Sequence, residues 1–473
     1  MNFIFERAIE YFYKICEIPH GSGDMEKISQ FCVDFANEHG LKSVRDEANN
    51  VVIFKSATKG YENYEPIILQ GHLDMVCQTV APFDFLNNGI SVKQDGDFLC
   101  ADGTTLGADN GIAVAMILAI LESKELSHPA IEAVFTTDEE IGMIGASRLD
   151  LNLLKSKKMI NLDSEDDGIV TVSCAGGVDF IAKLPIETKT LNGELVKVTL
   201  SGFKGGHSGV EIDKGRVNAD ILAGRLLASI DVGYNIVSIN GGNKGNAIPN
   251  ACIIELVTEN ASQFKDKAEK IFEEIKTEIC AREEGATISF EIGSQNEHLA
   301  FTDKLTKNIL YVLTLVPNGI VEMSAEIEGL VETSLNLGIL QTQKDFVTIH
   351  FALRSNKKTA LLFLVKRLEM FFENIDCETG TGGYYPPWEY NDSSVLQELY
   401  CKVYKDIYSR DPKIEAIHAG LECAVFSAGI KGLDCISIGP QLYDVHTVNE
   451  RMSLSSTKNL LELLVKILEN CRF

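Results

Sequence analysis

The stretch IILQGHLDM at residues 67–75 decides the fold of this chain. Its first four residues predict a short buried strand, and a histidine and an aspartate follow the strand almost directly. The same arrangement recurs in IEAVFTT (131–137), which precedes an acidic pair, and in MINL (159–162), which precedes an aspartate. GIAVAMILAILES (111–123) predicts a buried helix between these strands. Alternating strands and helices indicate a doubly wound, mostly parallel α/β sheet.

Acidic residues and histidines gather at the ends of these predicted elements. The carboxyl ends of parallel strands lie at one edge of such a sheet, which is where ligands bind. Two imidazoles and several carboxylates at one edge suit two divalent cations that share a bridging carboxylate. The pattern therefore predicts a metallohydrolase. The candidate residues are His72, Asp74, Asp109, Glu139, Glu140, Asp163 and His446.

Spacing suggests roles within two of the motifs. His72 and Asp74 are two residues apart, so on a strand they face the same way, and the carboxylate can accept the second N–H of a metal-bound imidazole. Glu139 and Glu140 are adjacent and point in different directions, so that one can bind metal while the other faces the substrate as a general base.

Each motif also has an ordinary explanation when it is taken alone. Asp109 in GADNG is placed to cap the helix that follows it. Asp163 belongs to the cluster DSEDD, which is compatible with a solvated turn, and His446 lies among polar residues in DVHTVNE. The combination of all these motifs in one chain is what favours a shared site.

Composition excludes several other classes. The 473 residues suggest two or more domains, and the formal net charge of −25 makes nucleic acid an unexpected partner. The twelve cysteines include no C-x-x-C pair, the first residues do not resemble a signal peptide, and no apolar run reaches membrane-spanning length. We therefore expect a cytoplasmic protein with free thiols and no membrane partner. A G-x-S-x-G elbow, an H-E-x-x-H helix and a P-loop are all missing from the sequence.

The pattern of elements changes after the polar stretch LPIETKTLNGE (184–194), which predicts a domain boundary near residue 187. We expect a discontinuous catalytic domain, residues 1–186 and 385–473, interrupted by an inserted α+β lid domain, residues 187–384, made of two units. The Gly- and Pro-rich stretch ETGTGGYYPPWEY (378–390) is interpreted as the return linker. Within the insertion we predict strands at 195–200, 328–338 and 346–354 and helices at 215–230, 262–282, 303–315 and 357–375.

The motifs H-L-D, G-A-D-N-G, D-E-E-I-G, the strand-ending L-D and the late H-T resemble those of the two-zinc metallopeptidases that include carboxypeptidase G, peptidase T and the carnosinases. The longer stretches GHLDMVCQ, GTTLGADNGIAVA, TTDEEIGMIGA, GGHSGVEI, HAGLECAVF and DVHTVNER are similar to the aminoacyl-histidine (β-alanyl-histidine, Xaa-His) dipeptidase subfamily. The resemblance covers essentially the whole chain, without a departure at a metal or catalytic position.

That resemblance implies two Zn²⁺ ions with Asp109 as the bridging ligand. His72 and Asp163 would complete one site, and Glu140 and His446 the other. Mn²⁺ or Co²⁺ could substitute, because the ligands include no thiolate. The resemblance also implies a cis peptide bond between Asp109 and Asn110.

The catalytic roles implied by the resemblance fall on two carboxylates. Asp74 would orient His72. Glu139 would take a proton from the water between the metals and pass it to the leaving amine.

The resemblance also assigns substrate contacts. Arg354, in FALRS, would clamp the peptide carboxylate in the bidentate way that suits arginine. His207, in FKGGHSG, would reach the carbonyl oxygen, and Glu422, in HAGLE, would pair with a free amine. Asn246 and Gly420 match further substrate-binding positions. From the residues alone, the more ordinary interpretation is that His207 is a loop histidine without a role and that Arg354 is a surface arginine.

In family members with a short lid, the partner subunit's lid lends the histidine. Here the insertion is long enough for one chain to supply both halves of the clamp, so a homodimer is possible but the site should not need it.

We therefore expect a dinuclear zinc dipeptidase that hydrolyses Xaa-His dipeptides, including β-alanyl-histidine. The alternatives are a broader dipeptidase or tripeptidase of the same family, a non-peptide amidohydrolase or deacylase, and a catalytically silent binding protein. The presence of Glu139 and of all five ligands argues against the last of these.

Overall fold

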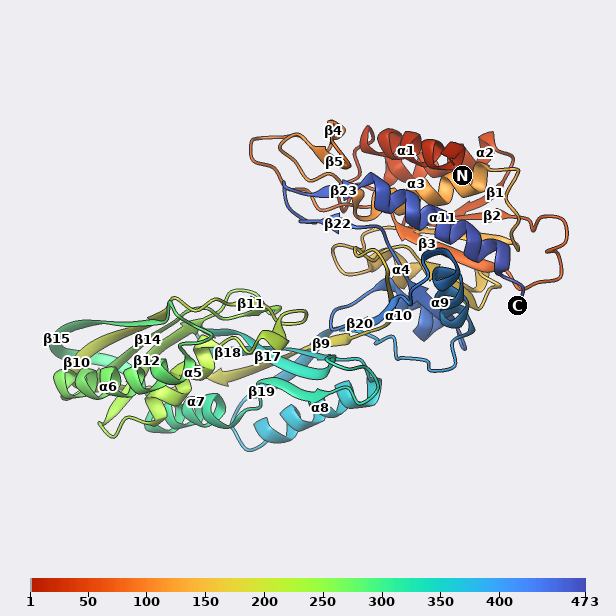
Figure 1. Ribbon diagram of the computed structural model, residues 1–473. Coiled ribbons are helices and arrows are strands. Elements are labelled where there is room, and N and C mark those ends of the chain that lie inside the picture. The colour runs from red at the N-terminus through yellow and green to blue at the C-terminus, as the bar shows by residue number, and fades with distance from the viewer. Residues whose placement is uncertain (1) are drawn as a thin grey trace. The chain divides into compact units, whose positions relative to one another are not determined.

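A computed structural model describes residues 2–473, and the chain divides into two compact units. The first unit comprises the chain up to Cys174 together with Trp388–Ala416 and Leu421–Phe473. The second comprises Ala175–Pro387 and Ile417–Gly420. The chain therefore leaves the first unit and returns to it, which makes the first unit discontinuous (Figure 1).

The first unit is built on an eight-stranded sheet with the order β1-β2-β6-β3-β7-β21-β8-β20. The neighbours β6, β3, β7 and β21 are parallel, and antiparallel pairs lie outside them. Helices α1 and α3 lie on one side of this sheet and α9 and α10 on the other (Figure 1). A small second sheet has the order β22-β23-β5-β4. The doubly wound, mostly parallel sheet predicted from the sequence is confirmed.

The elements of the first unit are α1 (Asn2–Cys16), α2 (Glu26–Glu38), β1 (Lys42–Arg45), β2 (Val51–Lys55), β3 (Ile67–His72), β4 (Val92–Asp95), β5 (Phe98–Ala101), α3 (Ala108–Glu122), β6 (Ile131–Thr136), α4 (Ile144–Arg148), η1 (Leu151–Leu153), β7 (Lys158–Asn161), β8 (Ile169–Cys174), α9 (Val395–Tyr408), β20 (Lys413–Ile417), α10 (Glu422–Gly429), β21 (Asp434–Ser437), β22 (Leu442–Tyr443), β23 (Arg451–Ser453) and α11 (Leu454–Asn470).

The interior of the first unit follows from its apolar runs. Every residue of β3 and of β6 is buried, as expected for central strands covered on both faces. Helix α3 is apolar all round, and all its residues from Gly111 to Leu121 are buried, which is the pattern of a helix enclosed by its neighbours. Helix α1 packs on α3, and α3 packs on β3. These elements form a rigid base for the loops that follow the strands.

The second unit is one antiparallel sheet with the order β15-β10-β14-β12-β17-β18-β9-β19, and β16 pairs with β17. Helices α5, α6, α7 and α8 cover one face of it (Figure 1). The two α/β units predicted for the insertion share this sheet, because β12 pairs with β17 through Asn240 and Gln341. Residues from both halves contribute to one hydrophobic core.

The elements of the second unit are β9 (Gly176–Pro185), β10 (Thr188–Ser201), β11 (Gly206–His207), η2 (Ile212–Lys214), α5 (Ala219–Ala228), β12 (Tyr234–Gly241), β13 (Ala247–Ile248), β14 (Cys252–Thr258), α6 (Ala261–Ile279), β15 (Thr287–Phe301), α7 (Asp303–Leu315), β16 (Gly319–Met323), β17 (Val331–Thr342), β18 (Phe346–Ser355), α8 (Lys358–Phe372) and β19 (Glu378–Tyr385).

Three features of the second unit differ from the sequence prediction. The unit begins at Ala175, before β9, and the polar stretch 184–194 runs through β9 and β10 rather than marking a linker. The predicted return linker begins as β19, an edge strand paired with β9. The fifteen-residue strand β15 was not predicted. All three segments are largely exposed, because an antiparallel sheet can leave one face and its edges to solvent, and polar residues there resemble loop sequence.

One buried carboxyl group in the second unit links stability to pH. Asp220, in the first turn of α5, is fully buried against Gly241, and neither of its carboxyl oxygens has a hydrogen-bond partner among the described residues. Burial raises the pKa of Asp220 to about 7, although the Cys252 thiol acts in the opposite direction. The folded state therefore keeps a proton that the unfolded state releases at lower pH.

We predict that Asp220 destabilises the fold as the pH rises. Its folded pKa is raised, so its contribution is fully favourable below the unfolded pKa and is lost as the pH rises toward 7. Relative to Asp220→Asn, the free energy of unfolding of the wild type should fall by roughly 2–3 kcal/mol between about pH 5 and 8. Denaturant titrations followed by circular dichroism measure this difference. Asp266→Asn on the exposed side of α6 is the control, and an identical pH slope for wild type and Asp220→Asn would contradict the prediction.

Candidate metal centre

The parallel strands of the first unit bring the predicted ligands to one edge of the sheet. Strand β3 ends at His72, and its neighbours β6 and β7 run parallel to it on either side. The chain continues from β6 to Glu139 and Glu140 and from β7 to Asp163. All these side chains therefore leave the sheet at the same end, as expected from the topology.

Asp109 lies at the centre of the group, with its two oxygens facing two different histidines. Its Oδ1 is 3.2 Å from His72 Nε2, and its Oδ2 is 3.0 Å from His446 Nε2. The same imidazole nitrogens face two further carboxylates: His72 Nε2 is 3.2 Å from Asp163 Oδ1, and His446 Nε2 is 2.9 Å from Glu140 Oε1. The structure thus brings together all five residues predicted as ligands, in two groups of three that share Asp109.

These donor atoms fit divalent cations. Ligand atoms of His72, Asp109 and Glu140 all lie within 4.8 Å of one another. Zinc bonds to nitrogen and oxygen are about 2.0–2.2 Å long, and tetrahedral geometry then separates the donors by roughly 3.4 Å, close to the contacts found here. Imidazole and carboxylate donors suit zinc, manganese and cobalt, whereas a thiolate site would select softer ions. The first unit therefore contains a candidate metal site.

Burial and close contacts between charged groups shift the pKa values of several side chains in the site. Burial would lower the pKa of His72, but Asp163 and Asp109 outweigh it and raise the pKa well above its usual range. Hydrogen bonding to Asp109 and Glu140 raises the pKa of His446 to about 11. Burial raises the pKa of Asp163 to about 6 despite the attraction of His72. The carboxyl groups of the site therefore favour the binding of positive charge among them.

The side chain of Asp74 accepts hydrogen bonds from the turn that carries Glu139 and Glu140 and from Ser22. Its Oδ1 accepts the backbone N–H of Glu139 at 2.9 Å, and its Oδ2 accepts that of Glu140 at 3.2 Å. The same carboxylate lies 3.4 Å from His72 Nδ1, and Ser22 donates to it at 2.8 Å. The hydrogen bond of His72 Nδ1 is made with the backbone oxygen of Asp74, at 3.0 Å, while the Asp74 carboxylate holds the turn that carries the acidic pair.

The peptide bond between Asp109 and Asn110 is cis, as the resemblance implied. The Asn110 side chain then links β3 to the segment after β7, because its Oδ1 accepts the His72 N–H at 3.2 Å and its Nδ2 donates to Leu162 O at 2.8 Å. Gly71 permits this approach, since a Cβ there would lie 2.5 Å from Asn110 Oδ1.

Glu422 lies beneath the site, which corrects its predicted contact with a substrate amine. Its side chain is fully buried and accepts hydrogen bonds from Gln70 at 2.5 Å and Thr136 at 2.6 Å. A carboxyl group enclosed in this way is not accessible to a substrate. Burial raises the pKa of Glu422 to about 8, so at neutral pH it is largely protonated. It ties the amino end of α10 to β3 and β6.

Glu450 was not among the candidates predicted from the sequence, although it lies only four residues after His446. It is almost fully buried and its carboxylate accepts backbone N–H groups from the segment that leads into Asp109. An acidic residue within the DVHTVNE motif was the available signal.

In the second unit, His207 and Asn246 belong to two adjoining segments. His207 of β11 pairs with Ala247 of β13, and Ser208 N donates to Asn246 O at 2.9 Å. His207 Nδ1 accepts the backbone N–H groups of Gly209 and Val210, each at 3.1 Å. Its proton therefore resides on Nε2.

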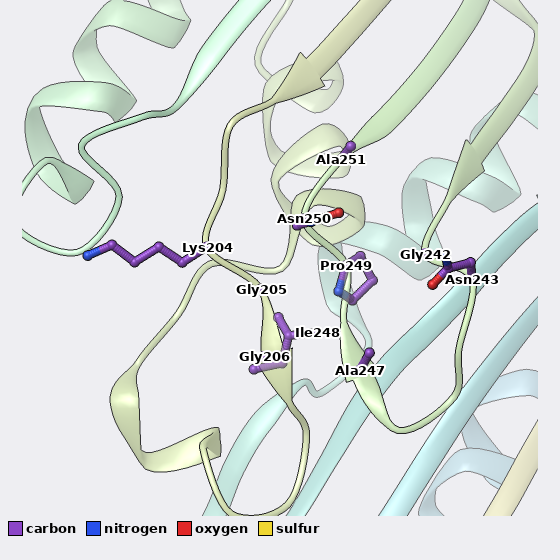
Figure 2. Close-up of a pocket in the computed structure, with 10 residues that line it drawn as sticks. All are labelled: Lys204, Gly205, Gly206, Gly242, Asn243, Ala247, Ile248, Pro249, Asn250 and Ala251. Carbon is purple, nitrogen blue, oxygen red and sulfur yellow. The ribbon is translucent and has the colours of Figure 1, made fainter. Parts of the chain in front are cut away.

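A cavity of about 390 Å³ lies beside these two segments. Lys204, Gly205 and Gly206 line one wall, and residues of the 242–251 loop line the other. Figure 2 shows that both walls are mainly backbone and small side chains. The loop that precedes His207 therefore borders a cavity lined mainly by backbone and small side chains.

Arg354 lies near His207 and His418 in the same unit. It donates to Tyr385 Oη at 2.8 Å, and its Nε has no hydrogen-bond partner among the described residues. Burial lowers the pKa of His207, and the Arg354 charge lowers it further, so the imidazole stays neutral at neutral pH. His418 precedes Gly420 by two residues and is 2.7 Å from Ser334 Oγ through its Nε2. His207 and His418 therefore both lie within the influence of the positive charge of Arg354.

Comparison with known proteins identifies the class. The sequence profile of peptidase family M20/M25/M40 matches residues 68–470. The cytosol non-specific dipeptidase of Escherichia coli (strain K12) is 35% identical over 468 residues, which cover 97% of this chain and 96% of that protein. The chain therefore belongs to peptidase family M20/M25/M40 and is a hydrolase of the peptidase class.

Solved structures agree. The crystal structure of aminoacylhistidine dipeptidase from Vibrio alginolyticus matches with a TM-score of 0.90 and 35% identity, covering 98% of this chain and 96% of that one. The aminopeptidase PepT from Bacillus cereus matches with a TM-score of 0.58 and 17% identity over 99% and 98% of the two chains, which shows a shared fold. Within residues 2–473, no helix combines the length and the apolar character needed to cross a membrane.

We predict two divalent ions per chain and a ligand-specific pattern of loss. His446→Ala and Glu140→Ala should each remove one ion, His72→Ala and Asp163→Ala the other, and Asp109→Ala should weaken both, because its two oxygens face both groups. Metal analysis after reconstitution with Zn²⁺ and gel filtration measures the stoichiometry. A wild-type protein saturated at one ion, or Asp109→Ala with both ions retained, would contradict this assignment.

Proposed function

We propose that this chain is a dinuclear zinc dipeptidase that cleaves Xaa-His dipeptides. The observation that carries the proposal is the position of Asp109, whose two oxygens face two imidazoles, each of which also faces a second carboxylate. His72, Asp109 and Asp163 would hold one ion and Asp109, Glu140 and His446 the other. The bound ions would acidify water and polarise the scissile carbonyl.

Glu139 is proposed as the general base. Burial raises the pKa of Glu139 well above its usual range, and Asp163 and Glu422 add to the effect while His72 opposes it. A carboxylate with a raised pKa accepts a proton from an attacking water and then returns it to the leaving amine. Asp74 holds the Glu139 amide, so the base is supported by the same residue that contacts His72.

His207 is proposed to donate a hydrogen bond to the substrate carbonyl oxygen. Its Nδ1 is occupied by two backbone N–H donors, so Nε2 is the donor, which is the polarity that a developing negative charge requires. Arg354 is proposed to bind the peptide carboxylate, and Asn246 and Gly420 to contact the substrate beside it. We also propose that the first unit is the catalytic domain and the second unit is the lid, with the lid starting at Ala175 rather than at residue 187 and ending at Pro387 rather than at residue 384.

The substrate class rests on two relatives. One is named a cytosol non-specific dipeptidase and the other an aminoacylhistidine dipeptidase, and each is matched over nearly its whole length. Both names support a dipeptide substrate and the first supports a cytoplasmic location. The first name also keeps a broader dipeptidase as the second candidate function, because its identity to this chain equals that of the histidine-directed enzyme.

A peptide panel distinguishes the two candidates. For the zinc-reconstituted protein, kcat/KM for Xaa-His dipeptides, including β-alanyl-histidine, should exceed that for matched Xaa-Leu dipeptides by roughly tenfold or more, about 1.4 kcal/mol of transition-state binding. Tripeptides should be poor substrates, because the carboxylate must reach Arg354. Equal rates for Xaa-His and Xaa-Leu would favour the non-specific dipeptidase, and preferred cleavage of tripeptides or N-acyl amino acids would overturn the proposal.

Two variants test the roles of Glu139 and His207 and the self-contained site. Glu139→Ala and His207→Ala should each retain both metal ions and lose at least about a hundredfold in kcat, the contribution expected of a general base or of an oxyanion donor. If each chain supplies both residues to its own site, no site in a mixed dimer contains both intact residues. Mixing the two inactive proteins under conditions of subunit exchange should therefore restore no activity. Recovered activity in the mixture would mean that His207 acts in the partner subunit's site, and near-normal kcat in Glu139→Ala would remove the general-base role.

A further inference from the structure

Four consecutive backbone amides in the first unit converge on one carboxylate. Glu450 Oε2 accepts the N–H groups of Leu106 at 2.7 Å and Gly107 at 3.1 Å. Its Oε1 accepts those of Ala108 at 2.8 Å and Asp109 at 3.3 Å. Glu450 is 3% exposed, so these bonds are shielded from competing water. The last of the four amides belongs to the residue whose side chain faces both histidines of the metal centre.

The segment held by Glu450 receives little support from its own helix. The first amides of a helix have no intrahelical partner, and α3 has no side chain that caps it locally. Gly107 has a left-handed φ of 73°, and Asp109 has non-helical dihedrals of −82° and 102°. Residues 106–109 therefore depend on a distant acceptor for their conformation, and Glu450 is that acceptor.

Glu450 also belongs to the segment that carries His446. Between Tyr443 and β23 the chain makes a tight loop in which Asp444 and His446 have left-handed φ values of 52° and 62°, which are uncommon for residues other than glycine. The Glu450 N–H closes this loop by donating to Thr447 O at 3.1 Å. Immediately afterwards, β23 pairs with β5 and β22. One residue thus joins the His446 loop to the Asp109 segment.

We propose that Glu450 is a positioning residue of the metal centre, setting Asp109 and His446 relative to each other. The proposal rests on the proposed function, since it concerns the same metal site. Asp109 Oδ2 and His446 Nε2 are 3.0 Å apart and come from segments separated by 337 residues. The hydrogen bonds from the amides of residues 106–109 to the Glu450 carboxylate connect those two segments directly, so they control the spacing of two ligands in different loops.

The first unit offers a matched control at the other end of the sheet. Glu132, near the start of β6, is also almost fully buried, and its carboxylate accepts the backbone N–H groups of Lys155 and Ser156 at 3.0–3.1 Å. Glu132 thus accepts backbone N–H groups as Glu450 does, but it lies at the opposite end of β6 from the turn that carries Glu139 and Glu140. Loss of Glu132 should destabilise the unit without disturbing the metal ligands.

The test compares Glu450→Gln with Glu132→Gln in the full-length chain. Glutamine keeps the size of glutamate, but its NH₂ group faces amides that need an acceptor, so part of the bonding is lost in each variant. Zn²⁺ affinity is measured by competition with a chromophoric chelator, melting temperature is measured on the metal-free proteins, and kcat and KM are measured on the zinc-saturated ones.

We expect both variants to lower the melting temperature of the metal-free protein. Only Glu450→Gln should weaken Zn²⁺ binding, by about 10- to 100-fold, which is typical when a residue that supports metal ligands is changed. It should also lower kcat while leaving KM close to that of the wild type. If Glu450→Gln does not fold, Glu450→Asp keeps the charge on a shorter side chain, and the same loss of Zn²⁺ affinity is expected of it.

The proposal would be overturned if the folded Glu450 variant kept the Zn²⁺ affinity and kcat of the wild type and only its melting temperature fell, as in Glu132→Gln. Glu450 would then be a purely structural carboxylate. A wild-type protein that binds no Zn²⁺ at these ligands would instead overturn the proposed function. The two failures are therefore distinguishable in one set of measurements.

Discussion

The carboxylate of Asp109, placed between two imidazoles, is the constraint on which the rest of the first unit depends. A carboxylate that faces His72 with one oxygen and His446 with the other must be fixed in both position and rotation. Asp163 and Glu140 add negative charge on either side of it. Bringing so many acidic groups together is costly unless positive charge is bound among them, and this cost is the physical reason to place cations there.

The scaffold meets this constraint with hydrogen bonds one layer away from the ligands. Asp74 holds the amides of the acidic pair, and Asn110 joins β3 to the segment after β7. Glu450 holds the amides that lead into Asp109. Below them, Glu422 binds Gln70 and Thr136 inside the sheet. Each of these contacts joins different elements, so the ligands are held by the fold as a whole and not by any one loop.

In the second unit, the His207 imidazole is held in its neutral form close to the positive charge of Arg354. Backbone N–H groups occupy Nδ1 of His207, and burial together with Arg354 keeps the pKa of the imidazole low. The pairing of β11 with β13 places His207 and Asn246 in adjoining segments. A single antiparallel sheet beneath them gives these loops a rigid support, as binding loops on a sheet generally require.

The sequence by itself determined the parallel sheet and the acidic residues and histidines that gather at its edge, because apolar runs mark buried strands and the ends of parallel strands meet at one edge. It did not determine β15, β19 or the start of the second unit, since exposed strands carry polar and glycine residues like those of loops. Only the tertiary structure decided the roles of Glu422 and Glu450. Their partners lie 352 and about 340 residues away in the chain, and no local pattern encodes which distant loops will meet.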